Sequence, residues 1–164
     1  MLIKKPYRWL LEISLIFFII FALRLWMQRD VVSGKAPNIS AFMLNKQYFD
    51  LYQNKTRPLL IHFWATWCPV CKLEQLNIEN ISKDYPVITI AMQSGNNLEL
   101  GQFMHDENLS FNVINDESGV LSKAYNIKGV PVSFIVAKNN KIEFVEVGYT
   151  TEPGLRLRLW WAGL

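Results

Sequence analysis

The apolar positions of the chain follow two patterns: one long run near the N-terminus and, after it, short runs separated by polar turns. The run from Trp9 to Met27 is interrupted by charge only at Glu12 and Arg24, near its two ends. As a helix with ~1.5 Å of rise per residue it would be about 28 Å long, close to the ~30 Å hydrocarbon core of a bilayer. The pattern therefore predicts a transmembrane signal anchor over residues 9–27.

Two other interpretations of this run compete with an anchor. A cleaved signal peptide needs small residues before its cut site, and residues 24–29 offer none. A buried core helix would need partners on every side, because the run is apolar all round. Residues 1–8 carry three basic side chains, which favours a cytoplasmic tail and an exported remainder.

The chain after the anchor has the pattern of one α/β domain. Residues 28–35 form a linker, and residues 36–164 contain apolar runs of strand length that alternate with helical patterns. A β-hairpin over residues 39–51 comes first. The predicted strands are 59–64, 86–92, 111–114, 131–137 and 141–147, and the predicted helices are 69–84, 97–107, 118–125 and 155–161, the last begun by Thr151-Glu152-Pro153. This order predicts a central mixed sheet flanked by helices on both faces.

Composition narrows the function. A net charge of +3 is too small to indicate nucleic-acid binding. Two cysteines cannot build a disulfide-rich scaffold, and a zinc site would need further ligands beside them. The two histidines, His62 and His105, are not at metal-ligand spacing. We therefore predict no metal, no cofactor and no nucleic-acid partner.

Cys68 and Cys71, the two cysteines, lie where the strand 59–64 gives way to a helix. Three positions apart, they share one helix face and can touch. At the helix N-terminus, unpaired N–H groups and the helix dipole stabilise a thiolate, so the pKa of Cys68 is lowered. Cys68 is then the nucleophile and Cys71 the resolving thiol, while Pro69 suits the first helical turn.

These residues resemble a known signature. Phe63-Trp-Ala-Thr-Trp-Cys-Pro-Val-Cys71 is similar to the active site of the thioredoxin superfamily, and Gly129-Val-Pro131 resembles its cis-proline loop. Glu74 matches the active-site glutamate of the membrane-anchored, extracytoplasmic TlpA/ResA-like branch. In overall layout the chain is most similar to the suppressor of copper sensitivity D family. The resemblance runs from about residue 36 to the C-terminus and implies a thioredoxin-like fold.

The resemblance also assigns roles at the site. Glu74 would accept the proton of Cys71, and Pro131 would be a cis-proline. Substrate would be contacted by Trp67, Pro69, Val70 and Val130. Val70 replaces the histidine of the strongly oxidising DsbA-like family, and a valine donates no hydrogen bond to the thiolate. His62 departs from the buried aspartate of thioredoxins proper, either as a proton shuttle or as structural filler.

Together these inferences predict a thiol-disulfide oxidoreductase in the bacterial inner membrane, with its catalytic domain in the periplasm. It would reduce disulfides of exported client proteins and be regenerated by a DsbD-like membrane electron donor. A disulfide-forming oxidant of the same fold is one alternative. A Cu(I)-binding module for copper tolerance that uses the same two thiols is another.

In the last helix, Arg156 and Arg158 are expected on a solvated face, and Trp160 with Trp161 on a packed one.

Overall fold

The computed structural model describes residues 7–28 and 31–164, with only the backbone described at residues 20, 21 and 23–28. The chain divides into two units, residues 1–30 and residues 31–164. The first contains α1 (Arg8–Gln28). Among the residues that the structure describes, no helix is both long and apolar enough to span a membrane. Most of the predicted basic tail lies outside the described residues.

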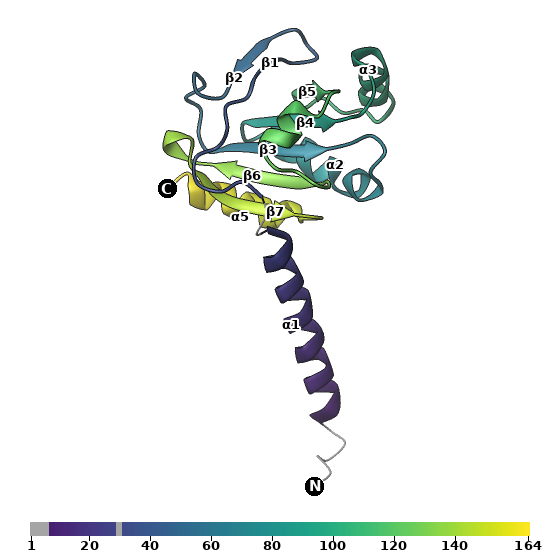
Figure 1. Ribbon diagram of the computed structural model, residues 1–164, viewed down its shortest axis with the longest axis vertical. Coiled ribbons are helices and arrows are strands. Elements are labelled where there is room, and N and C mark those ends of the chain that lie inside the picture. The colour runs from purple at the N-terminus through teal and green to yellow at the C-terminus, as the bar shows by residue number, and fades with distance from the viewer. Residues whose placement is uncertain (1–6, 29–30) are drawn as a thin grey trace. The chain divides into compact units, whose positions relative to one another are not determined.

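The second unit is built on a five-stranded mixed sheet in the order β5-β4-β3-β6-β7 (Figure 1). Its strands are β3 (Leu59–Trp64), β4 (Val87–Met92), β5 (Val113–Asp116), β6 (Val132–Val136) and β7 (Ile142–Val147). β3, β4 and β5 are parallel, whereas β6 is antiparallel to both β3 and β7. The mixed sheet predicted from the sequence is confirmed.

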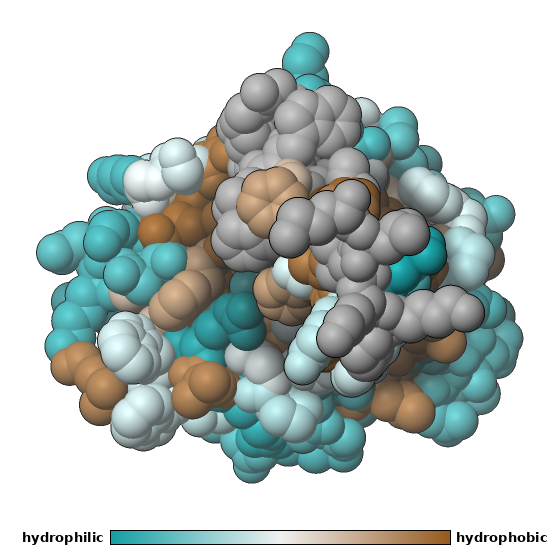
Figure 2. Space-filling model, turned by 90° about the horizontal axis from the view of Figure 1, so that it is seen from below, coloured by the Kyte–Doolittle hydropathy of each residue, from teal (hydrophilic) through white to brown (hydrophobic). Residues whose placement is uncertain are grey.

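Both faces of the sheet are covered, which explains why every residue of β3 is buried. The helices are α2 (Pro69–Ser82), α3 (Asn97–Asp106), α4 (Val120–Ala124) and α5 (Glu152–Ala162), with a short 3-10 turn, η2 (Lys138–Asn140). Leu60 and Trp64 of β3 join one core with residues of α2, α3 and α5. Ile61 and Phe63 join the other, with Tyr125 and the segment before β3. Figure 2 shows a face on which hydrophilic side chains predominate and apolar ones form separate patches.

The predicted hairpin is present as a separate two-stranded sheet. β1 (Ser40–Phe42) pairs antiparallel with β2 (Tyr48–Asp50), and Lys46 in the turn has a φ of 66°. Buried residues of this segment pack into the core that contains Ile61, Phe63 and Tyr125. The Tyr125 hydroxyl donates to the carbonyl oxygen of Pro37 at 2.7 Å, which fixes this segment to the main fold.

Two elements, β5 and α4, start two residues later than the sequence predicts. β5 begins at Val113 rather than at residue 111, because the N–H groups of Ser110 and Phe111 donate to the Glu79 carboxylate at 2.8 and 3.2 Å. α4 begins at Val120 rather than at residue 118, because Gly119 before it has a left-handed backbone with a φ of 73°. The Glu79 contacts join residues distant in sequence, and apolar periodicity carries no information about them.

The packed face predicted for Trp160 and Trp161 is wrong. Their exposed fractions are 55% and 62%, and the buried residues of α5 are Leu155 and Leu159. An i, i+4 pair defines one helix face, so residues one and two positions further along turn away from it. Arg156 and Arg158 lie beside this face, ion-paired with Asp84 and Glu146.

Candidate active site

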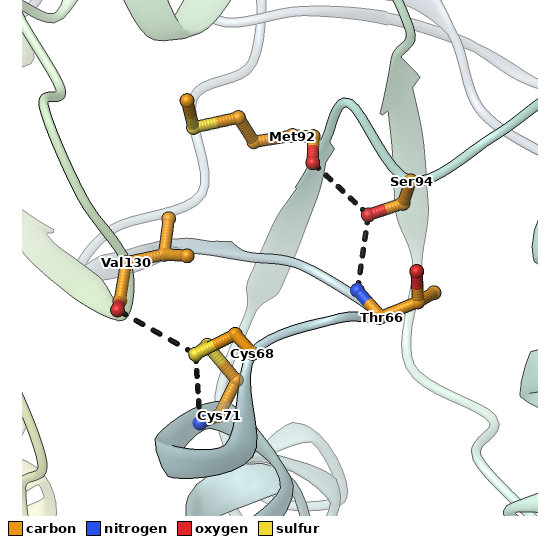
Figure 3. Close-up of a disulfide and its surroundings, with 6 residues drawn as sticks. All are labelled: Thr66, Cys68, Cys71, Met92, Ser94 and Val130. Carbon is orange, nitrogen blue, oxygen red and sulfur yellow. Dashed lines mark hydrogen bonds between the residues drawn. A yellow bond between two sulfur atoms is a disulfide. The ribbon is translucent and has the colours of Figure 1, made fainter.

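The two cysteines form a disulfide at the start of α2, directly after β3 (Figure 3). A tight turn, in which the Cys68 N–H donates to the Ala65 carbonyl at 3.2 Å, connects strand to helix. Cys68 is the N-cap, one position before the first helical residue, Pro69. Its Sγ accepts a hydrogen bond from the N–H of Cys71 at 3.1 Å. This sulfur is therefore held where helix N–H groups point.

Local electrostatics favour a thiolate at Cys68. The first turn of α2 contains no acidic residue, so nothing on it offsets the positive end of the helix dipole. In the disulfide form, Cys68 and Cys71 are 4% and 2% exposed. Trp67 and Val70 beside them are much more open, at 58% and 41%. These two exposed side chains therefore border the buried sulfurs, and the substrate-contacting role predicted for them stays a prediction.

The loop before β6 completes the approach to Cys68. The peptide bond between Val130 and Pro131 is cis, the conformation that the resemblance implies. The Val130 carbonyl oxygen lies 3.5 Å from Sγ of Cys68 (Figure 3). Segments separated by about sixty residues in sequence thus meet at one sulfur, and the backbone of this loop is available beside it. The substrate-contacting role of Val130 stays a prediction.

Sequence reasoning missed the residues that hold the active-site turn against β4. The N–H of Thr66 donates to the Ser94 hydroxyl at 3.1 Å, and that hydroxyl donates to the Met92 carbonyl at 3.0 Å (Figure 3). The indole N–H of Trp67 donates to the Gln93 carbonyl at 3.1 Å. The only available signal was a polar stretch following a buried strand. The hydrogen bond to Gln93 fixes the orientation of Trp67 next to Cys68.

Glu74 is fully buried on α2, one turn after Cys71. Neither carboxyl oxygen has a hydrogen-bond partner among the described residues. Burial raises the pKa of this carboxyl from 4.5 to about 8. The nearby backbone of Thr150 opposes the increase in pKa, and the charge of Glu146 adds to the increase. Glu74 is therefore protonated at neutral pH when the disulfide is formed.

His62 lies in a buried row of polar side chains across the sheet. Its Nδ1 is 2.9 Å from the Ser133 hydroxyl, its direct neighbour on β6. Ser133 in turn pairs with Glu146 on β7, which is ion-paired to Arg158 at 2.6 Å. Burial lowers the pKa of His62 to about 3, so the imidazole is neutral at physiological pH. One hydrogen bond and a neutral ring match the structural alternative for this residue.

The described residues contain no cluster of three or more His, Cys, Asp or Glu side chains that could hold a metal ion. His105, the second histidine, is exposed on α3 beside Asp106.

Comparisons with known proteins agree with this geometry. The Redoxin family profile matches residues 32–156. A thioredoxin-like protein of Haemophilus influenzae is 29% identical over 99% of this chain and 98% of its own length. The thiol-disulfide oxidoreductase ResA of Bacillus subtilis is 26% identical over 91% of this chain and 90% of its own length.

Solved structures show the same fold. The crystal structure of StoA from Bacillus subtilis has a TM-score of 0.66 and 24% identity, covering 74% of this chain and 96% of StoA. The crystal structure of a putative thiol:disulfide interchange protein DsbE from Chlorobium tepidum has a TM-score of 0.70 and 21% identity. The match covers 80% of this chain and 98% of that protein. The predicted thioredoxin-like fold is thus confirmed. The chain belongs to the Redoxin family and is a thioredoxin-like thiol-disulfide oxidoreductase, similar to ResA and StoA.

Proposed function

We propose that this oxidoreductase is a membrane-anchored reductase of disulfides in exported client proteins. The observation that carries the proposal is the placement of Cys68 at the N-cap of α2, disulfide-bonded to Cys71 and beside the Val130 carbonyl. The helix stabilises Cys68 as a thiolate once the pair is reduced. The loop at Val130 then gives a client chain a backbone carbonyl to bind next to the reacting sulfur.

The reaction begins with the reduced pair. The Cys68 thiolate attacks a client disulfide, forms a mixed disulfide, and releases the first client sulfur as a thiolate, which takes a proton from water. Cys71 then loses its proton and attacks Sγ of Cys68. The second client sulfur leaves, and the Cys68–Cys71 disulfide remains. Two electrons have passed to the client.

Glu74 is the destination we assign to the Cys71 proton, which requires its carboxyl to be ionised while the cysteine pair is reduced. This carboxyl is buried one helical turn from Cys71, and in the disulfide form its pKa of about 8 keeps it protonated at pH 7. A group that must hold a proton after Cys71 has reacted needs this property. The same proton returns to the Cys71 sulfur when an electron donor reduces the disulfide.

The direction of the reaction is supported by what surrounds Cys68. A strong oxidant stabilises its reduced thiolate by additional hydrogen bonds. Among the described contacts of this sulfur, the N–H of Cys71 is the only donor. Val70, between the cysteines, is apolar and 41% exposed. The balance therefore favours a reductant over the disulfide-forming alternative.

Location and partners follow from the N-terminal segment. Its support is the apolar run over residues 9–27, preceded by the basic tail. We propose that it anchors the protein in the bacterial inner membrane with the domain in the periplasm. A reductant there needs electrons from across the membrane, and a DsbD-like transporter would supply them. The resemblance of the sequence layout to the suppressor of copper sensitivity D family suggests copper tolerance as the setting.

A trapping experiment tests the mechanism. Cys71→Ala should accumulate client mixed disulfides on Cys68, seen as reductant-sensitive bands on a non-reducing gel, and Cys68→Ala should form none. Retained disulfide reduction by Cys68→Ala would refute the assignment of the nucleophile.

The equilibrium reduction potential tests the direction separately. Thioredoxin lies at about −270 mV and DsbA at about −120 mV. A value near the first supports the reductase, whereas a value near the second makes the protein an oxidant of newly exported chains.

A further inference from the structure

The C-terminal helix exposes a continuous apolar face that no described residue covers. Leu157, Trp160, Trp161 and Leu164 are 61%, 55%, 62% and 79% exposed. They follow the i, i+3, i+4, i+7 spacing of one helix face, and Leu164 lies just beyond the end of α5. Exposed large apolar side chains that gather in this way mark an interaction surface. We call these four residues the α5 apolar face.

Charges beside this face are neutralised within the domain. Arg156 contacts Glu152 at 2.8 Å and Asp84 at 2.7 Å, and Arg158 contacts Glu146 at 2.6 Å. Both guanidinium groups are directed to carboxylates on the protein, so neither needs a partner outside it. What α5 offers to a partner is therefore apolar and aromatic. Tryptophan in particular is enriched where proteins meet the membrane–water interface.

The connection between the segment we propose as the anchor and the first packed residue of the domain is short. α1 ends at Gln28, and Val31 already packs against the core of the domain. At ~3.5 Å per residue, the connection can span only about 10 Å. If α1 is inserted in a bilayer, the domain must lie at its surface.

Within the domain, the incoming segment and the end of α5 lie at the same end of the sheet. The Gly34 carbonyl accepts from the N–H of Ile142, and Ala36 donates to the Asn140 carbonyl, both at the β6–β7 turn. Arg57 hydrogen-bonds to Asn140. The next residue, Pro58, has its Cδ 3.4 Å from the place a Cβ would take on Gly163. These contacts connect residue 34 to residue 163.

The cysteines lie at the other end of the sheet. β3 starts at Leu59, next to Pro58, and runs to Trp64, after which the active-site turn begins. β6 starts directly after Val130 and Pro131, beside Cys68, and runs the opposite way toward the β6–β7 turn. Figure 1 shows the C-terminus and the β6–β7 turn at one edge of the domain. Contact through the α5 apolar face would leave the cysteines open.

We infer that the α5 apolar face binds the lipid surface of the membrane in which the chain is anchored, so that the domain has a fixed orientation with Cys68 directed away from the bilayer. This inference rests on the proposed anchoring. Lipid is favoured over a protein partner because the short connection keeps this end of the domain at the bilayer, while clients are bound at the far end. A tryptophan pair without free charge suits the interfacial layer.

Thiol accessibility of the full chain in nanodiscs tests the inference. The single-cysteine variants are Leu157→Cys and Leu164→Cys on the face, Leu98→Cys on α3 as an aqueous control, and Ile16→Cys as a reporter of anchoring. Leu98 is 84% exposed, so in water all three domain positions should react at similar rates. Cys68 and Cys71 stay oxidised and silent. The probe is a charged maleimide that does not enter lipid, and discs of phosphatidylethanolamine and phosphatidylglycerol hold one chain each.

We expect positions 157 and 164 to react at least about tenfold more slowly than position 98, the protection given by a state that is ~90% bound. The double substitution Trp160→Ser with Trp161→Ser should restore their rates, because both side chains are exposed and their loss leaves the core intact. Disulfide exchange by the chain should not change.

Each contrary result has a distinct meaning. Protection of position 16 with fast reaction at 157 and 164 overturns the docking and leaves the anchor intact. Fast reaction at position 16 overturns the anchor and, with it, the docking. Protection at 157 and 164 that appears only with two chains per disc assigns the face to a second copy and also overturns the inference.

Discussion

The buried carboxyl of Glu74 gives the sharpest quantitative prediction. Glu74→Gln replaces a group that must ionise with one of nearly the same shape that cannot. In the disulfide form the side chain is fully buried, and neither carboxyl oxygen has a hydrogen-bond partner among the described residues. Ionisation of this group in the folded protein is therefore costly, and the cost should appear as a dependence of stability on pH.

The direction and magnitude of this pH dependence follow from the pKa of Glu74. Burial raises it from 4.5 in the unfolded chain to about 8 in the folded one. Between these values the folded protein holds a proton that the unfolded chain has lost, so the wild type loses stability as pH rises. Each pH unit in this window changes the free energy of unfolding by about 1.4 kcal/mol. Relative to Glu74→Gln, the wild type should lose about 3 kcal/mol between pH 4.5 and 7, and about 4 kcal/mol by pH 8.

Urea unfolding of the oxidised unit, residues 31–164, measures this difference across the pH range. Glu79→Gln is the matched control, because Glu79 lies on the same helix but its carboxylate accepts hydrogen bonds from Ser110 and Phe111. Burial acts to raise the pKa of Glu79, but these hydrogen bonds outweigh it and lower the pKa. The stabilisation by the ionised Glu79 carboxylate is present above pH 4.5 and is lost as pH falls through its lowered pKa. The effect of Glu79 on stability therefore changes with pH in the opposite direction to that of Glu74. A difference between wild type and Glu74→Gln that stays constant from pH 4.5 to 8 would refute the buried, unpaired carboxyl.

Three further outcomes follow from the same structure. Glu79→Gln should lower the free energy of unfolding at pH 7 by about 2 kcal/mol, since it weakens charged hydrogen bonds to the segment before β5, and urea titration measures this. His62→Gln should flatten the acid side of the stability profile, because the wild-type imidazole, with its pKa lowered to about 3, loses stability as pH falls from 6.5; an unchanged profile would contradict its burial. Ser94→Ala should cost about 1–2 kcal/mol by leaving the Thr66 N–H without its acceptor, and faster hydrogen exchange at Thr66 should accompany the loss.

Much of this protein is determined by local sequence. The run Leu59–Trp64, apolar except at His62, predicts β3 with the same ends that the structure shows, because a strand buried on both faces needs a nearly continuous apolar run. Thr151, followed by a glutamate and a proline, predicts the start of α5, and its hydroxyl does accept from the N–H of Gly154. The chemistry of Cys68 and Cys71 is equally local, since helix spacing alone brings the two sulfurs together.

Only the tertiary structure decided which residues these elements pack against. The burial of Glu74 and the neutral state of His62 depend on strands and helices far away in sequence, and desolvation arises only when these pack together. The exposure of Trp160 and Trp161 depended on which face of α5 the sheet covers. An apolar side chain is compatible with a core and with a partner surface, and periodicity cannot separate the two. Local pattern therefore specified the elements and the reacting sulfurs, while packing specified the protonation states and the surface left for a partner.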